Sequence, residues 1–326
     1  MKTGKTEKYI LEKIEEQGGI LLSLIDPDKQ PFEKGAKVAE ASCEAGADVI
    51  LVGGSIGAQG MILDKTTKMI RERVNIPIVL FPGNVGTITH FADATYFMYV
   101  MNSRETYWMS TVQIQAAPVV KRLGIEPIPT GYIIVEPGKA VGWIANANLI
   151  PQNRGDLGAA TALAAEYMGA HFVVTDCGSG AEQPAPAAFV KAVKSVLSIP
   201  YFYAGGCRTA EKAHELIKAG ADGIQIGTAF EIEDGYDKVK QKVSEMSHAI
   251  KQAGREKKGK VAQAVEKAKG FMPMIRAPSW FKWKWPSLKK KNGKKLEEKK
   301  EEPAQVLKKE KYSLGEKEEK RYYKKR

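Results

Sequence analysis

The chain has 326 residues, 43% of them hydrophobic, which is enough for one large domain with a substantial core. Its three cysteines are odd in number and far apart, which argues against a disulfide framework and favours a reducing, cytoplasmic setting. No apolar run approaches the roughly 18 residues of a membrane span. The segment from Met1 to Gln17 is expected to be a short helix and not a signal peptide.

The net charge of +12 belongs to the C-terminal end of the chain. Residues 255–326 carry 25 Lys and Arg against 10 Asp and Glu, whereas residues 1–254 carry 25 against 28. The basic balance therefore says nothing about the ligand of the main domain. We expect a folded domain over residues 1–253 and a Lys-rich, flexible tail over residues 254–326.

Eight short apolar runs, each ending in turn residues, are expected to be strands: 20–25, 49–52, 76–81, 96–101, 132–135, 172–175, 201–203 and 223–226. Most are followed by a segment with helical periodicity, as at 32–45, 105–123, 158–168, 186–197 and 210–219. The stretch 237–253 is expected to be the closing eighth helix, which 256–269 can extend. Apolar strands that alternate with helices indicate a parallel sheet buried on both faces.

An internal repeat supports a closed architecture. Residues 45–53 read AGADVILVG, and residues 219–227 read AGADGIQIG. Each copy places a helix-terminal glycine, an aspartate, a buried strand and a glycine at the end of that strand. Eight strand–helix units within about 250 residues predict a (β/α)₈ TIM barrel. An open, doubly wound sheet is the alternative.

Glycines stand at three neighbouring strand ends, where barrel active sites lie. They are Gly178 and Gly180, Gly205 and Gly206, and Gly227. Glycine lets backbone N–H groups approach an anion closely, and the barrel's recurrent phosphate site uses the loops after the seventh and eighth strands. One such pair alone would be most simply a turn, but three neighbouring sets favour a phosphate site.

A carboxylate and a hydroxyl follow the first two strands. Asp26 and Ser55 would be neighbours at the barrel mouth. Mg²⁺ binds few protein oxygens and completes its shell with water and substrate phosphates, which suits a diphosphate held there. The alternative, equally open, is that the Asp-Pro-Asp-Lys segment is only a turn with a helix cap.

Other residues carry weaker signals. The four histidines share no metal-ligand spacing, and Cys177 is more simply a small buried thiol than a nucleophile. Aromatic residues gather on and after the fourth strand, where they either fill the core or line a groove for a long apolar substrate: Tyr96, Phe97, Tyr99, Tyr107 and Trp108.

Several segments, taken in order, carry a resemblance to a known family. They are LIDPDK at 24–29, VGGS at 52–55, LFPG at 80–83, MNS at 101–103, PTGYIIV at 129–135, CGSGA at 177–181, AGG at 204–206 and IGT at 226–228. Over residues 8–253 the chain resembles the geranylgeranylglyceryl phosphate synthase family, which includes bacterial heptaprenylglyceryl phosphate synthases. The LFPG and NS segments point to the larger, archaeal-type branch.

The resemblance implies a cytoplasmic, Mg²⁺-dependent TIM-barrel prenyltransferase of lipid biosynthesis. It would join geranylgeranyl diphosphate to the 3-hydroxyl of sn-glycerol 1-phosphate, forming the first ether bond of archaeal membrane lipids. Asp26 and Ser55 would hold Mg²⁺ and the diphosphate. The glycerol phosphate site would comprise Val174, Thr175, Asp176, Cys177, Gly178, Ser179, Gly180, Gly205, Gly206, Gly227 and Thr228. The chain is also expected to form a homo-oligomer.

Two departures concern the acceptor site. The family usually has Tyr-Leu-Glu-Ala-Gly-Ser-Gly where residues 174–180 read VTDCGSG, and Ala204 replaces one glycine of a Gly-Gly-Gly run. The tyrosine hydroxyl is lost, while Asp176 keeps the carboxylate on a shorter side chain and is the candidate to orient or deprotonate the acceptor hydroxyl. The alternatives are a non-catalytic barrel that binds phosphate or prenyl lipid, and transfer of a longer prenyl chain. The choice between glycerol 1- and 3-phosphate stays open.

The tail contains a Trp/Lys segment at 271–295, in which Trp280, Trp283 and Trp285 alternate with lysines. Tryptophan and lysine together favour peripheral contact with an anionic membrane surface. Nucleic-acid binding is the less favoured alternative, although basic and aromatic residues can also stack on bases. Residues 296–326 are mostly charged and are expected to stay solvated.

Overall fold

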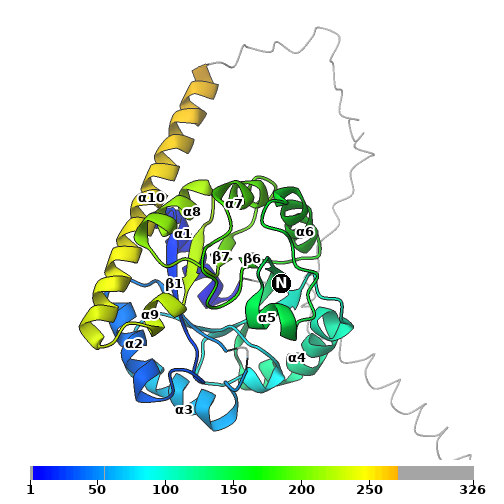
Figure 1. Cartoon of the computed structure of the whole chain (residues 1–326), viewed down its shortest axis with the longest axis vertical. Coiled ribbons are helices and arrows are strands. Elements are labelled where there is room, and N and C mark those ends of the chain that lie inside the picture. The colour runs from blue at the N-terminus through cyan, green and yellow to red at the C-terminus, as the bar shows by residue number, and fades with distance from the viewer. Residues whose placement is uncertain (1–2, 55, 271–326) are drawn as a thin grey trace, which may run out of the picture. The chain divides into compact units, whose positions relative to one another are not determined.

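The computed structural model describes residues 3–54 and 56–270, in which eight parallel strands close into a barrel in chain order (Figure 1). The predicted (β/α)₈ fold is confirmed. The strands are β1 (Ile20–Ile25), β2 (Val49–Val52), β3 (Ile78–Leu80), β4 (Ala94–Val100), β5 (Glu126–Ile134), β6 (Phe172–Asp176), β7 (Tyr201–Ala204) and β8 (Gly223–Ile226).

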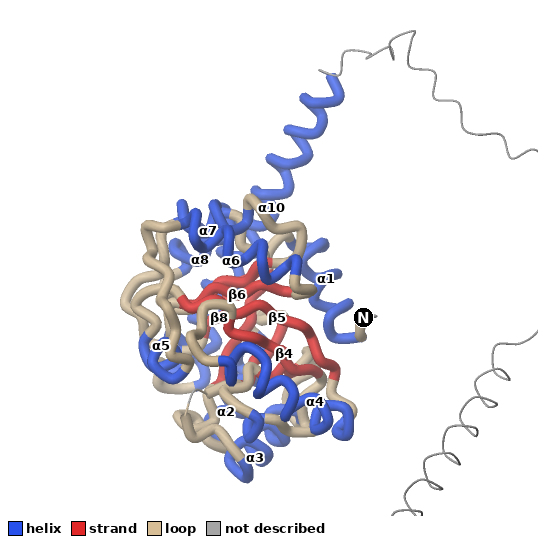
Figure 2. The backbone as a smooth tube through the Cα atoms, turned by 90° about the vertical axis from the view of Figure 1, so that its right-hand side faces the viewer, coloured by secondary structure: helices blue, strands red, loops and turns tan. Residues whose placement is uncertain are grey.

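Helices surround the strands (Figure 2). They are α1 (Lys5–Gln17), α2 (Glu33–Glu44), α3 (Gly60–Arg71), the short η1 (Val85–Thr87) and η2 (Tyr107–Thr111), α4 (Val112–Leu123), α5 (Lys139–Ile144), α6 (Gly155–Tyr167), α7 (Ala187–Lys194), α8 (Ala210–Ala219), α9 (Thr228–Glu231) and α10 (Tyr236–Gly270). Helix α10 runs along one side of the barrel, against α8 and α2 (Figure 1).

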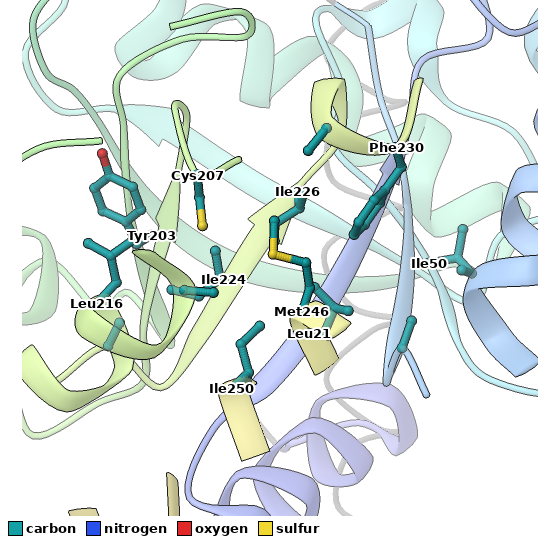
Figure 3. Close-up of a cluster of buried hydrophobic side chains, with 14 of the residues drawn as sticks. Leu21, Ile50, Tyr203, Cys207, Leu216, Ile224, Ile226, Phe230, Met246 and Ile250 are labelled. Atoms are coloured by element: carbon teal, nitrogen blue, oxygen red, sulfur yellow. The ribbon is translucent and has the colours of Figure 1, made fainter. Parts of the chain in front are cut away.

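The apolar core has two layers because successive strand side chains point to opposite faces. One layer fills the barrel itself and includes Leu22, Tyr96 and Phe202. The other lies between the strands and the helices, where Leu21 and Ile224 meet Met246 and Ile250 of α10, as Figure 3 shows. The interior layer fills the middle of the barrel, so a ligand can reach the inside of the barrel only at an end.

Strand β5 begins earlier than the sequence pattern predicts, at Glu126 and not at 132. Pro127 and Pro129 argue against a strand because they cannot donate a ladder hydrogen bond. The Pro129 carbonyl accepts from the N–H of His171, so this proline faces β6, whose pairing with β5 begins only at Thr130. The absence of N–H donors at these two prolines therefore removes few hydrogen bonds from the sheet.

The two copies of the Ala-Gly-Ala-Asp repeat perform the same structural task. The carboxylates of Asp48 and Asp222 accept hydrogen bonds from the N–H of Leu21 (2.9 Å) and Tyr201 (3.0 Å), which lie at the starts of neighbouring strands. The N–H of each aspartate also donates to the carbonyl of its partner residue. Each copy thus fixes the register of two adjacent strands at the amino end of the barrel.

Helix α1 packs at this amino end. Its first N–H groups, from Thr6 and Glu7, donate to the carboxylate of Glu126 at 2.8 and 2.9 Å, and Ile10 packs with the side chains of the barrel interior. The Glu7 carboxylate also lies 2.8 Å from Nδ1 of His171, so this histidine has a structural partner. With the amino end occupied, the carboxyl end of the barrel is left for a ligand.

Helix α10 continues past residue 253, where the closing helix was expected to end, and through the extension expected at 256–269. Lys257 donates to the carbonyl of Ala221 (3.0 Å) and to Asp222 (3.1 Å), so contacts with the barrel persist beyond that point. The predicted Trp/Lys segment at 271–295 and the rest of the tail lie outside the described residues.

Candidate active site

The carboxyl ends of the strands surround an open cavity of about 1030 Å³, a volume that includes the solvent at its mouth. Each strand, or the loop that follows it, contributes to the lining. Representative residues in strand order are Asp26, Gly54, Phe81, Met98, Tyr132, Asp176, Gly205 and Thr228. Barrel enzymes bind their substrates at this end.

The loop after β1 presents a carboxylate to the cavity. Asp26 begins a tight turn in which its backbone oxygen accepts hydrogen bonds from the N–H groups of Lys29 (3.0 Å) and Gln30 (2.8 Å). Its side chain does not cap α2, since that helix begins after Phe32 without a side-chain cap. The Asp-Pro-Asp-Lys segment therefore forms a turn but does not cap the helix, and Asp26 lines the cavity.

The Asp26 carboxylate belongs to a cluster of charged groups. Lys29 Nζ lies 2.6 Å from Asp26 Oδ2, 3.6 Å from Glu231 Oε2 and 3.3 Å from Ser179 Oγ. Burial lowers the pKa of Lys29, but the nearby carboxylates raise it by more, and the net shift is upward. Burial, and next the charge of Asp26, raise the pKa values of Asp28 and Glu231. Negative charge thus accumulates at this side of the mouth.

The residues on the Asp26 side of the mouth could bind a hard cation only if a substrate supplied further ligands. Ser55, the second predicted metal ligand, lies outside the described residues, although the preceding Gly54 lines the cavity. Among the described residues, no three His, Cys, Asp or Glu side chains gather closely enough to hold a metal. Mg²⁺ needs only one or two carboxylates when substrate phosphates complete its shell, so the all-oxygen donors around Asp26 fit it.

The loops after β6, β7 and β8 form the neighbouring side of the mouth. Gly205 and Gly206 have φ angles of +86° and +73°. A Cβ at Gly205 would lie 2.8 Å from Asp176 Oδ1, and one at Gly206 only 2.3 Å from the carbonyl oxygen of Gln183, so both positions require glycine. Within the described chain, the N–H groups of Gly180, Gly205 and Gly206 donate to no protein acceptor. They are available to an anion.

Side-chain contacts hold these loops together. Ser179 Oγ lies 3.1 Å from Thr228 Oγ1. Arg208 donates from Nε to the carbonyl of Ala181 (3.3 Å) and from Nη2 to that of Gly180 (3.2 Å). Because Arg208 also lines the cavity, a permanent positive charge joins the N–H groups on this side.

The predicted glycerol phosphate residues divide into two groups. Side chains or backbone that line the cavity come from Asp176, Ser179, Gly180, Gly205, Gly206, Gly227 and Thr228. The N–H of Gly178 instead donates to Oδ1 of Asp176 at 2.6 Å. The roles of these residues in binding stay predictions.

Three of the predicted residues point their side chains elsewhere. Val174 packs inside the barrel. Thr175 Oγ1 lies 2.6 Å from the Tyr201 hydroxyl, and Cys177 Sγ lies 3.1 Å from that of Tyr203. Strand alternation turns Thr175 and Cys177 outward, so only their backbone can meet a substrate. Burial raises the pKa of the Cys177 thiol to about 11, which fits an inert buried thiol.

Asp176 is buried with both carboxylate oxygens hydrogen bonded. Oδ2 accepts from the Tyr132 hydroxyl at 2.6 Å, and Oδ1 accepts from Gly178. Burial raises the pKa of Asp176, while these two hydrogen bonds act to lower it. Burial and the charge of Asp176 raise the pKa of Tyr132 far enough that its phenol stays protonated. Tyr132 pairs in register with Val174, so β5 supplies a hydroxyl beside the position where the family tyrosine is missing.

An apolar groove leads away from the mouth. A second cavity of about 460 Å³ shares Pro82, Met98, Val100 and Trp108 with the first. Its remaining lining comes mainly from β4 and α4, including Ala116. Because these four residues line both cavities, the two cavities adjoin, and their shared and neighbouring apolar lining is called the apolar groove below.

The aromatic residues around β4 divide between the core and the lining of the cavities. Tyr96 is fully buried and does not line the first cavity, although it lines the second. Trp108 lines both cavities, and Tyr107 packs edge-on against it with ring centroids 5.0 Å apart. Tyr99 instead turns outward and donates to the carbonyl of Ala165 at 3.2 Å.

Several residues at the mouth have no role predicted from the sequence: Lys29, Tyr132, Arg208, Gln225 and Glu231. Period-two alternation along β5 could have directed Tyr132 inward, had the early part of that strand been predicted. Glu231 carried no signal, because it belongs to the short α9 that follows the last strand.

The sequence of this barrel matches the model of the PcrB family over residues 12–247. The chain belongs to the PcrB family. Among similar proteins, the geranylgeranylglyceryl phosphate synthase of Thermococcus kodakarensis is 43% identical over 251 residues, which cover 77% of this chain and 99% of the relative. The enzyme of the same name from Methanococcoides burtonii is 43% identical over 248 residues, or 76% and 99% of the two chains.

A solved structure agrees with this assignment to the PcrB family. The (S)-3-O-geranylgeranylglyceryl phosphate synthase of Thermoplasma acidophilum, in complex with its substrate sn-glycerol-1-phosphate, superposes with a TM-score of 0.73 at 34% identity. The match covers 77% of this chain and 100% of that structure.

Proposed function

We propose that this chain joins a geranylgeranyl group, supplied as its diphosphate, to the 3-hydroxyl of sn-glycerol 1-phosphate. The products are geranylgeranylglyceryl phosphate and diphosphate. The observation that carries the proposal is the position of the Tyr132–Asp176 pair, which lies between a set of anion-binding N–H groups and an apolar groove. The names of relatives 43% identical to this chain support it.

The phosphate of the acceptor fits the loops after β6, β7 and β8. The free N–H groups of Gly205 and Gly206 and the Thr228 hydroxyl would donate to its oxygens, and Arg208 would balance its charge. A glycerol phosphate held in this way extends its hydroxyl toward Asp176, whose Oδ1 lies within 2.8 Å of a Cβ built on Gly205. Orientation of the acceptor hydroxyl is the main contribution of this half of the site.

The prenyl chain fits the apolar groove, with its diphosphate at the Asp26 side of the mouth. Asp26, with Ser55, would hold Mg²⁺, which when bound neutralises charge on the leaving diphosphate. Trp108 and Met98 would line the path of the chain from the mouth into the second cavity. Burial of the chain there excludes water from the reacting allylic carbon.

Asp176 would accept the proton of the acceptor hydroxyl as the bond forms. The glycerol oxygen bonds to the allylic carbon, the bond from that carbon to the diphosphate oxygen breaks with its electron pair, and the proton passes to the Asp176 carboxylate. Tyr132 holds the carboxylate in place and donates to Oδ2, leaving the acceptor hydroxyl to approach along a remaining lone pair.

A turnover assay tests the function. The full chain is incubated with glycerol 1- or 3-phosphate and with prenyl diphosphates of graded length, with MgCl₂ or with EDTA. We expect transfer to glycerol 1-phosphate, a preference for the geranylgeranyl chain and loss of turnover in EDTA. Preference for a longer donor would favour the alternative, transfer of a longer prenyl chain. Binding of both substrates without turnover would favour the non-catalytic barrel.

The tail would bring the barrel to its lipid substrate. Within the described residues no helix is long and apolar enough to cross a membrane. The proposal of peripheral contact at the cytoplasmic membrane face rests on the Trp/Lys segment at 271–295, because each basic residue near an anionic surface contributes about 1 kcal/mol. Co-sedimentation with anionic liposomes, with and without residues 271–326, tests it. Unchanged binding after truncation would contradict it.

Self-association is a further part of the proposed function. Large apolar side chains are exposed on the described surface, most of all Trp143 on α5, which is 84% exposed. A second copy of the chain is the partner we expect. Light scattering of the purified chain measures the oligomeric mass, and a monomeric mass at all concentrations would contradict this expectation.

A further inference from the structure

The ammonium group of Lys29 lies between the two halves of the proposed site. Its Nζ is 2.6 Å from Asp26 Oδ2, on the side that would hold the diphosphate. It is also 3.3 Å from Ser179 Oγ, which lies 3.1 Å from Thr228 Oγ1 on the side that would hold the acceptor phosphate. A contact of 3.6 Å joins it to Glu231. One side chain therefore reaches both anion-binding regions.

A divalent cation on Asp26 would compete with Lys29. Asp26 is buried, and Oδ2 is the oxygen that the ammonium group takes. A metal ion bound to the same carboxylate repels the ammonium group, because two positive charges would then share one acceptor. The Lys29 side chain is 44% exposed and has a flexible four-carbon stem, so Nζ can leave Asp26 without disturbing the fold.

The contacts that remain lead Nζ toward the phosphate side. Ser179 is already within 3.3 Å, and Glu231 keeps the ammonium group at the mouth. A phosphate bound beside Ser179 and Thr228 would add charged oxygens next to Nζ. Hydrogen bonds between an ammonium group and a phosphate are stronger than one to a neutral hydroxyl. The released lysine thus has a better partner only when the acceptor is present.

We propose that Lys29 is a mobile ligand of the acceptor phosphate, held by Asp26 in the free protein and released when the cation and the diphosphate bind. This rests on the proposed function, which assigns the two anions to the two sides of one cavity. Its consequence is cooperative binding: the donor frees the ammonium group for the acceptor, and by linkage the acceptor tightens binding of the donor.

Calorimetric titration of the full chain with sn-glycerol 1-phosphate measures this coupling. Titrations are run alone and with MgCl₂ plus an unreactive geranylgeranyl diphosphate analogue, in which methylene replaces the oxygen between the prenyl chain and phosphorus. We expect the analogue to lower the wild-type Kd at least about fivefold. Lys29→Met should abolish this change yet bind the analogue no more weakly, because Asp26 has lost its competitor. Lys29→Arg should retain part of the coupling.

Lys34→Met is the matched control. Lys34 is exposed in the first turn of α2, five residues after Lys29, and its side chain makes no hydrogen bond or ion pair within the described residues. It should keep wild-type coupling. Coupling that persists in Lys29→Met, or a wild-type chain that transfers the prenyl group without coupling, overturns this inference and leaves the proposed function standing. A wild-type chain that neither transfers the group nor binds the analogue overturns both.

Discussion

Tyr132 donates a 2.6 Å hydrogen bond to Asp176 between adjacent strands of the barrel. The pair joins a side chain that must stay protonated to one that must lose its proton in order to act as a base. Burial raises both pKa values, but the hydrogen bond opposes the rise at Asp176. The working pH of the site therefore depends on a residue of β5 as well as on the altered β6.

Replacement of Tyr132 by Phe should move the acidic limb of the pH profile to higher pH. Asp176 accepts a proton only when ionised, so activity is lost as pH falls through its pKa. The phenol hydrogen bond lowers that pKa, and its removal raises it. Turnover at neutral pH should fall roughly tenfold, as expected for loss of a hydrogen bond to a charged group. The measurement is kcat against pH.

Tyr201→Phe is the control for this change. It also removes a buried phenol, one that lies 2.6 Å from Thr175 Oγ1 in the outer layer, but it leaves Asp176 untouched. Its acidic limb should coincide with that of the wild type. If the limb of Tyr132→Phe stays in place or moves to lower pH, the phenol does not tune the carboxylate.

Asp176→Ala should reduce turnover strongly with little loss of prenyl diphosphate binding. A general base contributes typically about 10²–10⁴-fold. Asp176→Asn tests the same point with a side chain of equal size, which can still accept from Gly178. Because Asp176 is not among the proposed ligands of the diphosphate, binding of the donor should change little in either variant. Near-normal turnover in both variants would exclude Asp176 as the base.

The sequence predicted the fold well because each buried strand is short, apolar and bounded by turn residues. Seven of the eight strands begin within two residues of their predicted starts, and β5 alone does not. Its prolines suppress the local signal, and only the late start of pairing with β6 makes them acceptable. That is a tertiary relationship, which local propensity cannot express.

The site was predictable only in part, for a similar reason. Residues at strand ends, such as Asp26 and Gly205, could be found because every barrel opens at that end. Lys29 and Arg208 could not, since their positions depend on how separate loops meet. Thr175 and Cys177 were included as part of a continuous segment, whereas strand alternation turns their side chains outward.

Gly205→Ala should raise the KM for glycerol phosphate and lower stability. The new Cβ would enter the anion-binding region, 2.8 Å from Asp176 Oδ1, at a φ of +86°. Gly124→Ala shares the strained conformation, with φ of +71°, but its Cβ would meet nothing within 4 Å. That control should lose about 1 kcal/mol of stability and keep its KM. Equal increases of KM in the two variants would mean that backbone strain alone, and not a Cβ in the anion-binding region, is responsible.

Asp222→Ala should destabilise the barrel without changing the chemistry. The change removes the partner of the Tyr201 N–H and of two lysine side chains, Lys194 and Lys257. A loss of about 3 kcal/mol is expected for such a group, or roughly 6–12 °C in Tm. Asp156→Ala, which removes an exposed carboxylate paired with Arg154, should change Tm much less. Reduced turnover per folded molecule in Asp222→Ala would contradict a purely structural role.

Ala116→Phe should shift the preference from geranylgeranyl to shorter prenyl diphosphates. Ala116 lines the second cavity from α4, and a phenyl ring there would occupy space that the end of a long chain needs. Ile114→Phe places the same ring two residues away on a position that is 72% exposed, so it should keep the wild-type preference. The ratio of kcat/KM for C₂₀ and C₁₀ donors measures the effect. Because the mouth is unaltered, kcat with the short donor should remain near wild type, and an equal loss with both donors would mean that the groove does not hold the chain.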